Sequence, residues 1–223
     1  MFTQAFEILW TYRQGFISGL KVTMELALFI WVVGILLGTF TGLLANIFPL
    51  TAGRCIRSAA AVLSAIPAIV LLFWAYFPLQ IIVGVTVEPF WTSALTLTTL
   101  NCVAVAELVR GLLAEFPPQY RDAATVCGLS PAKTFFRIEL PLILRQALPT
   151  LLMLQVTMLH LTLFTSLISV EDVFRIAQRI NSTVYRPVEI YSAVAILFLI
   201  ICLPLQLLAR HLQRHFGITL RER

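Results

Sequence analysis

Five long stretches without a charged side chain dominate this sequence, and they limit what the chain can fold into. They cover residues 26–53, 58–87, 89–106, 146–170 and 190–209. A helix needs about 20 apolar residues to cross a bilayer core of roughly 30 Å, and each stretch approaches or exceeds that length. Charged residues make up only 12% of the chain, whereas soluble domains are about one-quarter charged. We therefore predict an all-α membrane protein with about five transmembrane helices.

Proline and glycine modify two of these stretches. Pro67 and Pro78 fall inside the second stretch, where they should kink the helix or shorten its regular part. Gly34, Gly38 and Gly42 recur every four residues in the first stretch, which lines up one face on which a neighbouring helix can approach closely. Glycine is also simply frequent in membrane helices, so both interpretations of this spacing stay open.

The basic residues indicate an orientation. With five spans, eleven of the sixteen Lys and Arg residues fall on one side of the membrane and five on the other. The positive-inside rule places the richer side, with the 107–145 loop and the C-terminus, in the cytoplasm. The N-terminus is then outside, and residues 1–16 are predicted to form an amphipathic segment at the interface. The arginines are scattered and form no basic stripe, so nucleic acid is not expected as a partner.

The cytoplasmic loop, residues 115–145, is predicted to contain two short helices across a tight turn. Residues 121–127 form the first helix, and Gly128 follows where a helix C-terminus favours a left-handed residue. Ser130 can cap the second helix, with Pro131 in its first turn. An ordinary polar connector is the alternative for this segment.

The spacing within this loop resembles a known motif. The matching residues are Asp122-Ala123-Ala124, then after three residues Gly128, and after nine more Ile138-Glu139-Leu140-Pro141. They resemble the EAA loop of ABC importer membrane subunits, which reads Glu-Ala-Ala, three residues, Gly, nine residues, Ile-x-Leu-Pro. The resemblance implies a type I importer permease fold, and a coupling helix whose ATPase-docking residues are Asp122, Ala123, Ala124, Gly128 and Pro141. Because their side chains are small, Ala123 and Ala124 would let the ATPase pack close to the helix backbone. Asp122 is one methylene shorter than the usual Glu.

Other segments resemble the polar amino-acid branch of these importers. Residues 106–111, 159–162 and 176–182 are similar to that branch, most of all to histidine/lysine/arginine/ornithine permeases. The resemblance implies the permease subunit of an importer for polar amino acids, basic ones among them, in the bacterial inner membrane. It also implies three partners: an ABC ATPase dimer carrying ATP and Mg, a second homologous permease chain, and an extracytoplasmic amino-acid-binding protein. The chain has no Gly-x-x-x-x-Gly-Lys-Ser/Thr loop, so it is expected to bind no cofactor and to be no enzyme.

Fewer residues match the family pattern in the predicted membrane spans. The family often has Phe-Arg-Gly-Thr-Pro where this chain has residues 63–67, and only Pro67 is kept. Met153 and Leu154 stand where members usually have polar residues. These losses motivate an alternative, in which this chain is the structural half of a heterodimer and its companion holds the substrate site.

Polar residues in the fourth stretch are the candidates for a substrate path, because buried polar groups in a bilayer are costly. They are Gln155, Thr157, His160 and Thr162, which could share a broad helix face. Alternatives are a subunit-interface role for His160 and a hydrogen bond of Thr157 to its own helix. An intramembrane enzyme using His160 and Asp172 is disfavoured, because no catalytic motif accompanies them.

Metal and disulfide chemistry are not expected. His211 and His215 share a helix face at metal-ligand spacing, but arginines flank them and no third ligand is near in the sequence. The four cysteines lie far apart without paired spacing. We predict a solvated basic tail, and cysteines that serve as small packing residues.

Overall fold

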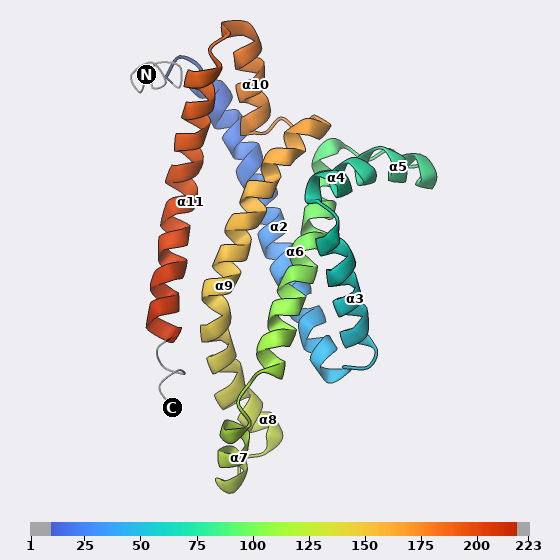
Figure 1. Ribbon diagram of the computed structural model, residues 1–223, viewed down its shortest axis with the longest axis vertical. Helices are drawn as coiled ribbons and strands as arrows, with labels where there is room; N and C mark the ends of the chain where they lie inside the picture. Colours follow the sequence, from blue (N-terminus) through green and yellow to red (C-terminus); the bar gives the residue numbers. More distant parts are fainter. Residues whose placement is uncertain (1–9, 218–223) are drawn as a thin grey trace.

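The computed structural model describes residues 10–217, and every regular element in that range is a helix. The long helices are α2 (Arg13–Ile47), α6 (Pro89–Ala114), α9 (Leu140–Leu161) and α11 (Pro187–Gly217). The shorter elements are α3 (Ala52–Ala65), α4 (Ala68–Tyr76), α5 (Pro78–Val83), α7 (Pro118–Val126), α8 (Pro131–Thr134), η1 (Phe135–Glu139), η2 (Thr162–Ile168) and α10 (Val173–Val184). The long helices run roughly along the longest axis of the molecule (Figure 1). The predicted all-α fold is confirmed.

Within residues 10–217, four helical segments are long and apolar enough to cross a bilayer by themselves. The second predicted span is instead made of α3 followed by α4 and α5, bent by 95°. Pro67 precedes α4 and Pro78 opens α5, positions that proline tolerates because it has no N–H to donate to the preceding turn. The predicted kink is confirmed, and counting the bent pair as one span gives the predicted five.

Glycine brings α2 and α6 into close contact. A Cβ atom on Gly34 would lie 2.5 Å from the side-chain nitrogen of Asn101, and one on Gly38 would lie 2.6 Å from Cβ of Val105. Gly42 likewise faces the backbone of α6, because a Cβ there would lie 2.7 Å from a carbonyl oxygen. The four-residue spacing therefore packs two helices together, as one of the two interpretations of the sequence predicted.

Gly38→Ala should destabilise the chain by about 2 kcal/mol, because the new methyl group forces α2 and α6 apart. Gly111→Ala is the matched control, since nothing lies within 4 Å of its Cβ position, and alanine should stabilise that helix by about 0.5–1 kcal/mol. Thermal unfolding of the purified chain in detergent measures both. Shifts of the same sign and size would contradict the close α2–α6 packing.

The core lies between the long helices. One cluster joins α2, α9, α10 and α11, and another joins α2, α4, α6 and α9, with Leu26, Leu97 and Leu159 fully buried. The outer faces are also apolar: Leu36 is 66% exposed and Ile200 is 67% exposed. Such faces suit contact with lipid, whereas a soluble protein rarely leaves large apolar areas uncovered.

The two ends of the bundle carry different elements. The start of α2, α10 and the α4–α5 arm lie at one end, and α7, α8, the α2–α3 turn and the end of α11 lie at the other (Figure 1). The first and last described helices thus begin and finish at opposite ends, as an odd number of spans requires. Of the predicted interfacial segment, residues 1–9 lie outside the described range, and residues 13–16 form the first turn of α2.

Candidate functional site

The α7–α8 loop projects beyond the long helices at one end of the bundle (Figure 1). Of the predicted loop, residues 115–145, the last six already belong to α9. Gly128 has φ of +74° and ends α7 as predicted. The N–H of Leu129 donates to the carbonyl of Ala124 at 3.0 Å, and that of Gly128 donates to the carbonyl of Thr125 at 2.9 Å. These are the two hydrogen bonds of a Schellman motif. Together with Pro131 in the first turn of α8, they make the compact pair of helices that the sequence predicts.

Two details of the loop differ from expectation. Ser130 stands at the N-cap of α8, but its side chain makes no capping hydrogen bond; its carbonyl accepts from both the N–H and the hydroxyl of Thr134 instead. Ala124 is only 3% exposed, because it lies on the inner face of α7. Asp122 and Ala123 are exposed. Of the two alanines expected to let a partner pack close to the backbone, only Ala123 is therefore accessible.

An ion pair holds α7 against the N-terminal end of α9. Arg121 donates through Nε and a terminal nitrogen to the two oxygens of Glu139, both at 2.9 Å. The Glu139 side chain is only 10% exposed, and the paired carboxylate raises the pKa of the Arg121 guanidinium. Glu139 ends a π-helical turn, a feature often found at functional positions. The loop is therefore tied to a membrane helix as one unit.

The four candidates for a substrate path do not come together. Gln155 and Thr162 are buried, whereas Thr157 and His160 are exposed. The expectation of one shared face is wrong, because residues two apart on a helix point about 200° apart. Gln155 and Thr162 are buried against the other helices, whereas Thr157 and His160 lie on exposed faces.

Gln155 takes part in a hydrogen-bond network that links three helices. The side chains of Gln155 and Asn101 bond to each other at 2.9 and 3.3 Å. Asn101 also donates to the carbonyl of Ile30 at 2.9 Å, and Trp31 donates to the carbonyl of Gln155 at 3.0 Å. Because these bonds satisfy the amides inside the apolar core, Gln155 holds α2, α6 and α9 together and does not face a cavity.

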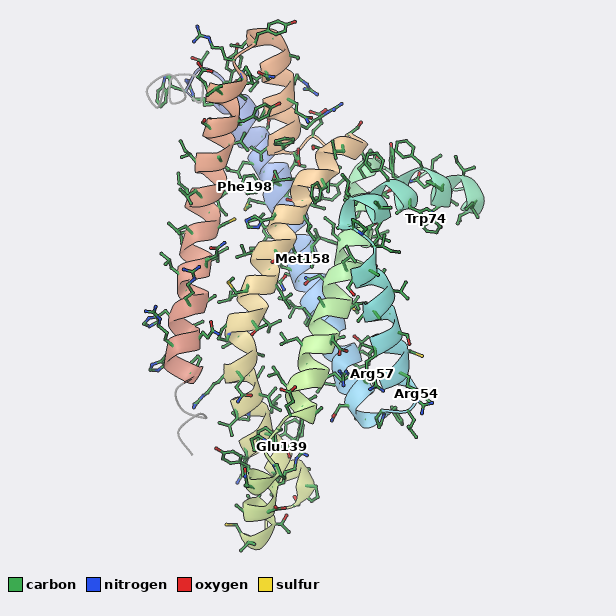
Figure 2. The ribbon with its side chains drawn as sticks, viewed as in Figure 1. Arg54, Arg57, Trp74, Glu139, Met158 and Phe198 are labelled. Carbon is green, nitrogen blue, oxygen red and sulfur yellow. The ribbon has the colours of Figure 1, made fainter. Side chains whose placement is uncertain are left out.

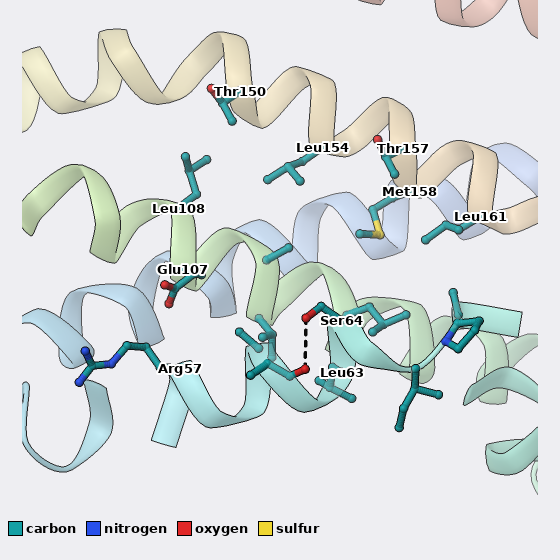
Figure 3. A pocket seen from close by; sticks show the side chains of 18 residues that line it. Arg57, Leu63, Ser64, Glu107, Leu108, Thr150, Leu154, Thr157, Met158 and Leu161 are labelled. Atoms are coloured by element: carbon teal, nitrogen blue, oxygen red, sulfur yellow. Dashed lines mark hydrogen bonds between the residues drawn. The ribbon is translucent and has the colours of Figure 1, made fainter. Parts of the chain in front are cut away.

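A groove of about 900 Å³ opens between α3, α6 and α9 (Figure 3). Its wall is mostly apolar, and Thr157 is the one substrate-path candidate that lines it. The Thr157 hydroxyl donates to the carbonyl of Met153 on its own helix at 3.1 Å, and that of Ser64 donates to Ala61 at 3.2 Å. Arg57 and Glu107 lie at the end nearer the α7–α8 loop.

The stretches where the sequence resemblance thins meet across this groove. Leu63, Pro67 and Leu154 all line it, although residues 63–67 and Leu154 are far apart in the sequence. The groove is thus lined by residues at the positions where the family resemblance implies polar groups. Sequence analysis missed both this wall of α3 and the Arg121–Glu139 pair. The charges at positions 121 and 139 were the only available signal for that pair.

Metal or disulfide chemistry finds no support in residues 10–217. No group of three or more His, Cys, Asp or Glu side chains in that range could hold a metal ion. His211 and His215 stack with ring centres 6.5 Å apart and are exposed. All four cysteines are free, and Cys202 is buried.

Comparison with known proteins gives a consistent result. Residues 32–218 match the family described as binding-protein-dependent transport system inner membrane component. The glutamine transport system permease protein of Escherichia coli K12 is 32% identical over 216 residues, 94% of this chain and 96% of that protein. The histidine/lysine/arginine/ornithine transport system permease protein of Salmonella typhimurium is 33% identical over 124 residues, 56% of this chain and 53% of that protein.

Solved structures are similar over the same range. The crystal structure of an amino acid ABC transporter with histidines matches with a TM-score of 0.81 and 27% identity, covering 94% of this chain and 98% of that one. An inward-facing structure of a methionine ABC transporter matches with a TM-score of 0.69 at 18% identity, over 94% of this chain and 98% of that one. The second likeness concerns the fold alone.

Proposed function

Because this chain belongs to the family of binding-protein-dependent transport system inner membrane components, we propose that it is the permease subunit of an ATP-driven importer for polar amino acids. The relatives named above transport glutamine or histidine, lysine, arginine and ornithine, which share a polar side chain. The observation that carries the proposal is the projecting α7–α8 loop with exposed Asp122 and Ala123. A permease without its own ATPase needs such a surface.

The partner ATPase would dock on the α7–α8 loop. Val126 is 89% exposed and Phe136 is 66% exposed, so apolar side chains are available around Ala123. ATP and Mg would be bound by the ATPase, and an extracytoplasmic protein would deliver the amino acid to the opposite end. The end with the loop also carries most of the basic residues, which supports a cytoplasmic loop and C-terminus and an outside N-terminus.

Closure of the ATPase would move the loop, and the Arg121–Glu139 pair would pass that movement to α9. The groove between α3, α6 and α9 is the surface along which the amino acid would cross, opposite a second permease chain. Rigid-body rocking of one half against the other around such a site is a general route to alternating access.

The composition of the groove favours a second candidate function. Leu63 and Leu154 make the wall apolar, and the hydroxyls of Ser64 and Thr157 already bond to their own helices. In that case this chain would be the structural half of a heterodimer, and its companion would make the specific contacts with the substrate.

Uptake measurements with the reconstituted complex decide between the two. Thr157→Val removes a groove hydroxyl without changing the shape of the side chain, and should raise KM for the amino acid about fivefold if this half contacts the substrate. Thr99→Val is the matched control, because Thr99 is also exposed and bonds to its own helix but does not line the groove. An unchanged KM in both variants would leave the substrate site to the companion chain.

A further inference from the structure

A second, smaller pocket lies in the corner where α2 ends, α3 begins and α6 ends. Its volume is about 100 Å³, roughly that of three water molecules. Asn46 lines it from the end of α2, Pro49 from the turn that follows, Arg57 from α3 and Arg110 from α6. It opens near the end of the bundle that carries the α7–α8 loop, where Arg54 and Arg57 are labelled in Figure 2.

The pocket has a net positive charge, because its two arginines, Arg57 and Arg110, interact with the single carboxylate of Glu107. Arg110 is paired with Glu107, which uses both of its oxygens on that one guanidinium. Arg57 donates through Nε to the carbonyl of Gly53 at 3.2 Å, and no acidic side chain in residues 10–217 forms an ion pair with it. The first turn of α3 also contains no acidic residue, although the positive end of the helix dipole lies there. An anion would balance the positive charge that Glu107 leaves over.

Exposed apolar side chains stand beside the charged pocket. Phe48 and Leu50 flank Pro49 and are 56% and 69% exposed, and Ile47 is 64% exposed. Ile47 ends α2, and Phe48 and Leu50 lie in the turn between α2 and α3, where a membrane helix would meet water. Charge and apolar surface at this depth match the two parts of a phospholipid, and basic pockets between membrane helices are known to bind anionic head groups.

We propose that this pocket binds the phosphate of an anionic phospholipid, with Arg57 and Arg110 as donors and Phe48 and Leu50 against the acyl chains. The guanidinium groups suit a phosphate, because they present several donors in one plane. The site depends on insertion into a membrane and not on which amino acid is transported.

Native mass spectrometry of the full complex in detergent, titrated with phosphatidylglycerol, tests the site. Arg57→Gln should weaken binding of that lipid about tenfold, the loss expected for a charge-assisted hydrogen bond. Arg54→Gln is the matched control, because it removes the same charge from the same helix but does not line the pocket; binding should change less than twofold. The double variant Glu107→Gln/Arg110→Gln should also bind the lipid about tenfold more weakly. Because it removes both members of the ion pair, it leaves no unpaired carboxylate behind.

Three outcomes would overturn the proposal. Equal losses of lipid affinity for Arg57→Gln and Arg54→Gln would mean that the lipid is attracted nonspecifically to the basic end of the bundle and does not bind in this pocket. Equal affinity for phosphatidylcholine with the same acyl chains would exclude the anionic head group as the ligand. Displacement of the lipid by inorganic phosphate at similar concentration would make free phosphate the occupant. Phe48 and Leu50 would then contribute nothing to binding.

Discussion

Arg121→Met is expected to reduce amino-acid uptake by the reconstituted complex more than tenfold, while the ATPase still hydrolyses ATP at its basal rate. The substitution leaves the Glu139 carboxylate largely buried without its partner, which should destabilise the fold by about 2 kcal/mol. The loss is smaller than for a fully buried ion pair, because Arg121 is half exposed. The loop would then lose its fixed orientation to α9, so ATPase movement would no longer reach the membrane helices. Uptake and ATP hydrolysis are measured in the same vesicles.

Two further variants separate the loss of coupling from the loss of stability. Arg121→Met/Glu139→Gln removes the orphaned charge, so the thermal midpoint should recover, yet uptake should stay low because the tie between α7 and α9 is still missing. Arg137→Met removes an exposed charge from the same loop and should change neither quantity appreciably. Uptake that recovers together with the thermal midpoint would show that the pair only stabilises the fold.

The parts of the fold that depend on local chemistry could be predicted from the sequence. Uncharged stretches located the long helices, because a charged side chain is costly in lipid. Pro67 and Pro78 located the bend, since proline removes a donor wherever it stands. The 95° angle of that bend could not be predicted, because it depends on what α4 packs against. Gly38 predicted close packing but could not name α6 as the neighbour.

The candidate site divides in the same way. The turn at Gly128 was predictable, because its left-handed backbone and the proline after it are local signals. The Arg121–Glu139 pair was not, because its geometry depends on the π-helical turn before α9. The four substrate-path candidates could not be sorted from the sequence, because periodicity says which residues share a face but not whether that face meets a groove or another helix. Gln155 shows this: it is buried against Asn101, so its polar group is structural.

Asp172 carries the other large expected effect, because its carboxyl group is buried at the junction of η2 and α10. The residue is 0% exposed. One oxygen accepts from the N–H of Arg175 at 2.7 Å, whereas the other has no partner of ordinary hydrogen-bond geometry in the described chain. Burial raises the pKa of Asp172 from 3.8 to about 7; the N–H groups of Arg175 and Phe174 and the Thr165 hydroxyl oppose that rise, and the Glu171 charge adds to it.

The sign of the pH dependence follows from that raised pKa. The folded chain holds this proton more tightly than the unfolded chain, so the contribution of Asp172 to stability is highest below about pH 4 and falls as the pH rises to about 7. The full loss above pH 7 is at most about 4 kcal/mol. Asp172→Asn cannot ionise and keeps an oxygen that accepts from Arg175. It should therefore match the native chain at low pH and be more stable than it at pH 8.

Thermal unfolding of both chains in detergent at pH 4.5 and pH 8 measures this difference. At pH 8 the thermal midpoint of Asp172→Asn should be higher by up to about 10 °C, and at pH 4.5 the difference should shrink to about a quarter of that. Asp122→Asn is the control, because Asp122 is exposed on α7 and its neutralisation should move neither midpoint by much. Equal midpoints at pH 8 would mean that water satisfies the second oxygen of Asp172. The junction of η2 and α10 would then be open to solvent.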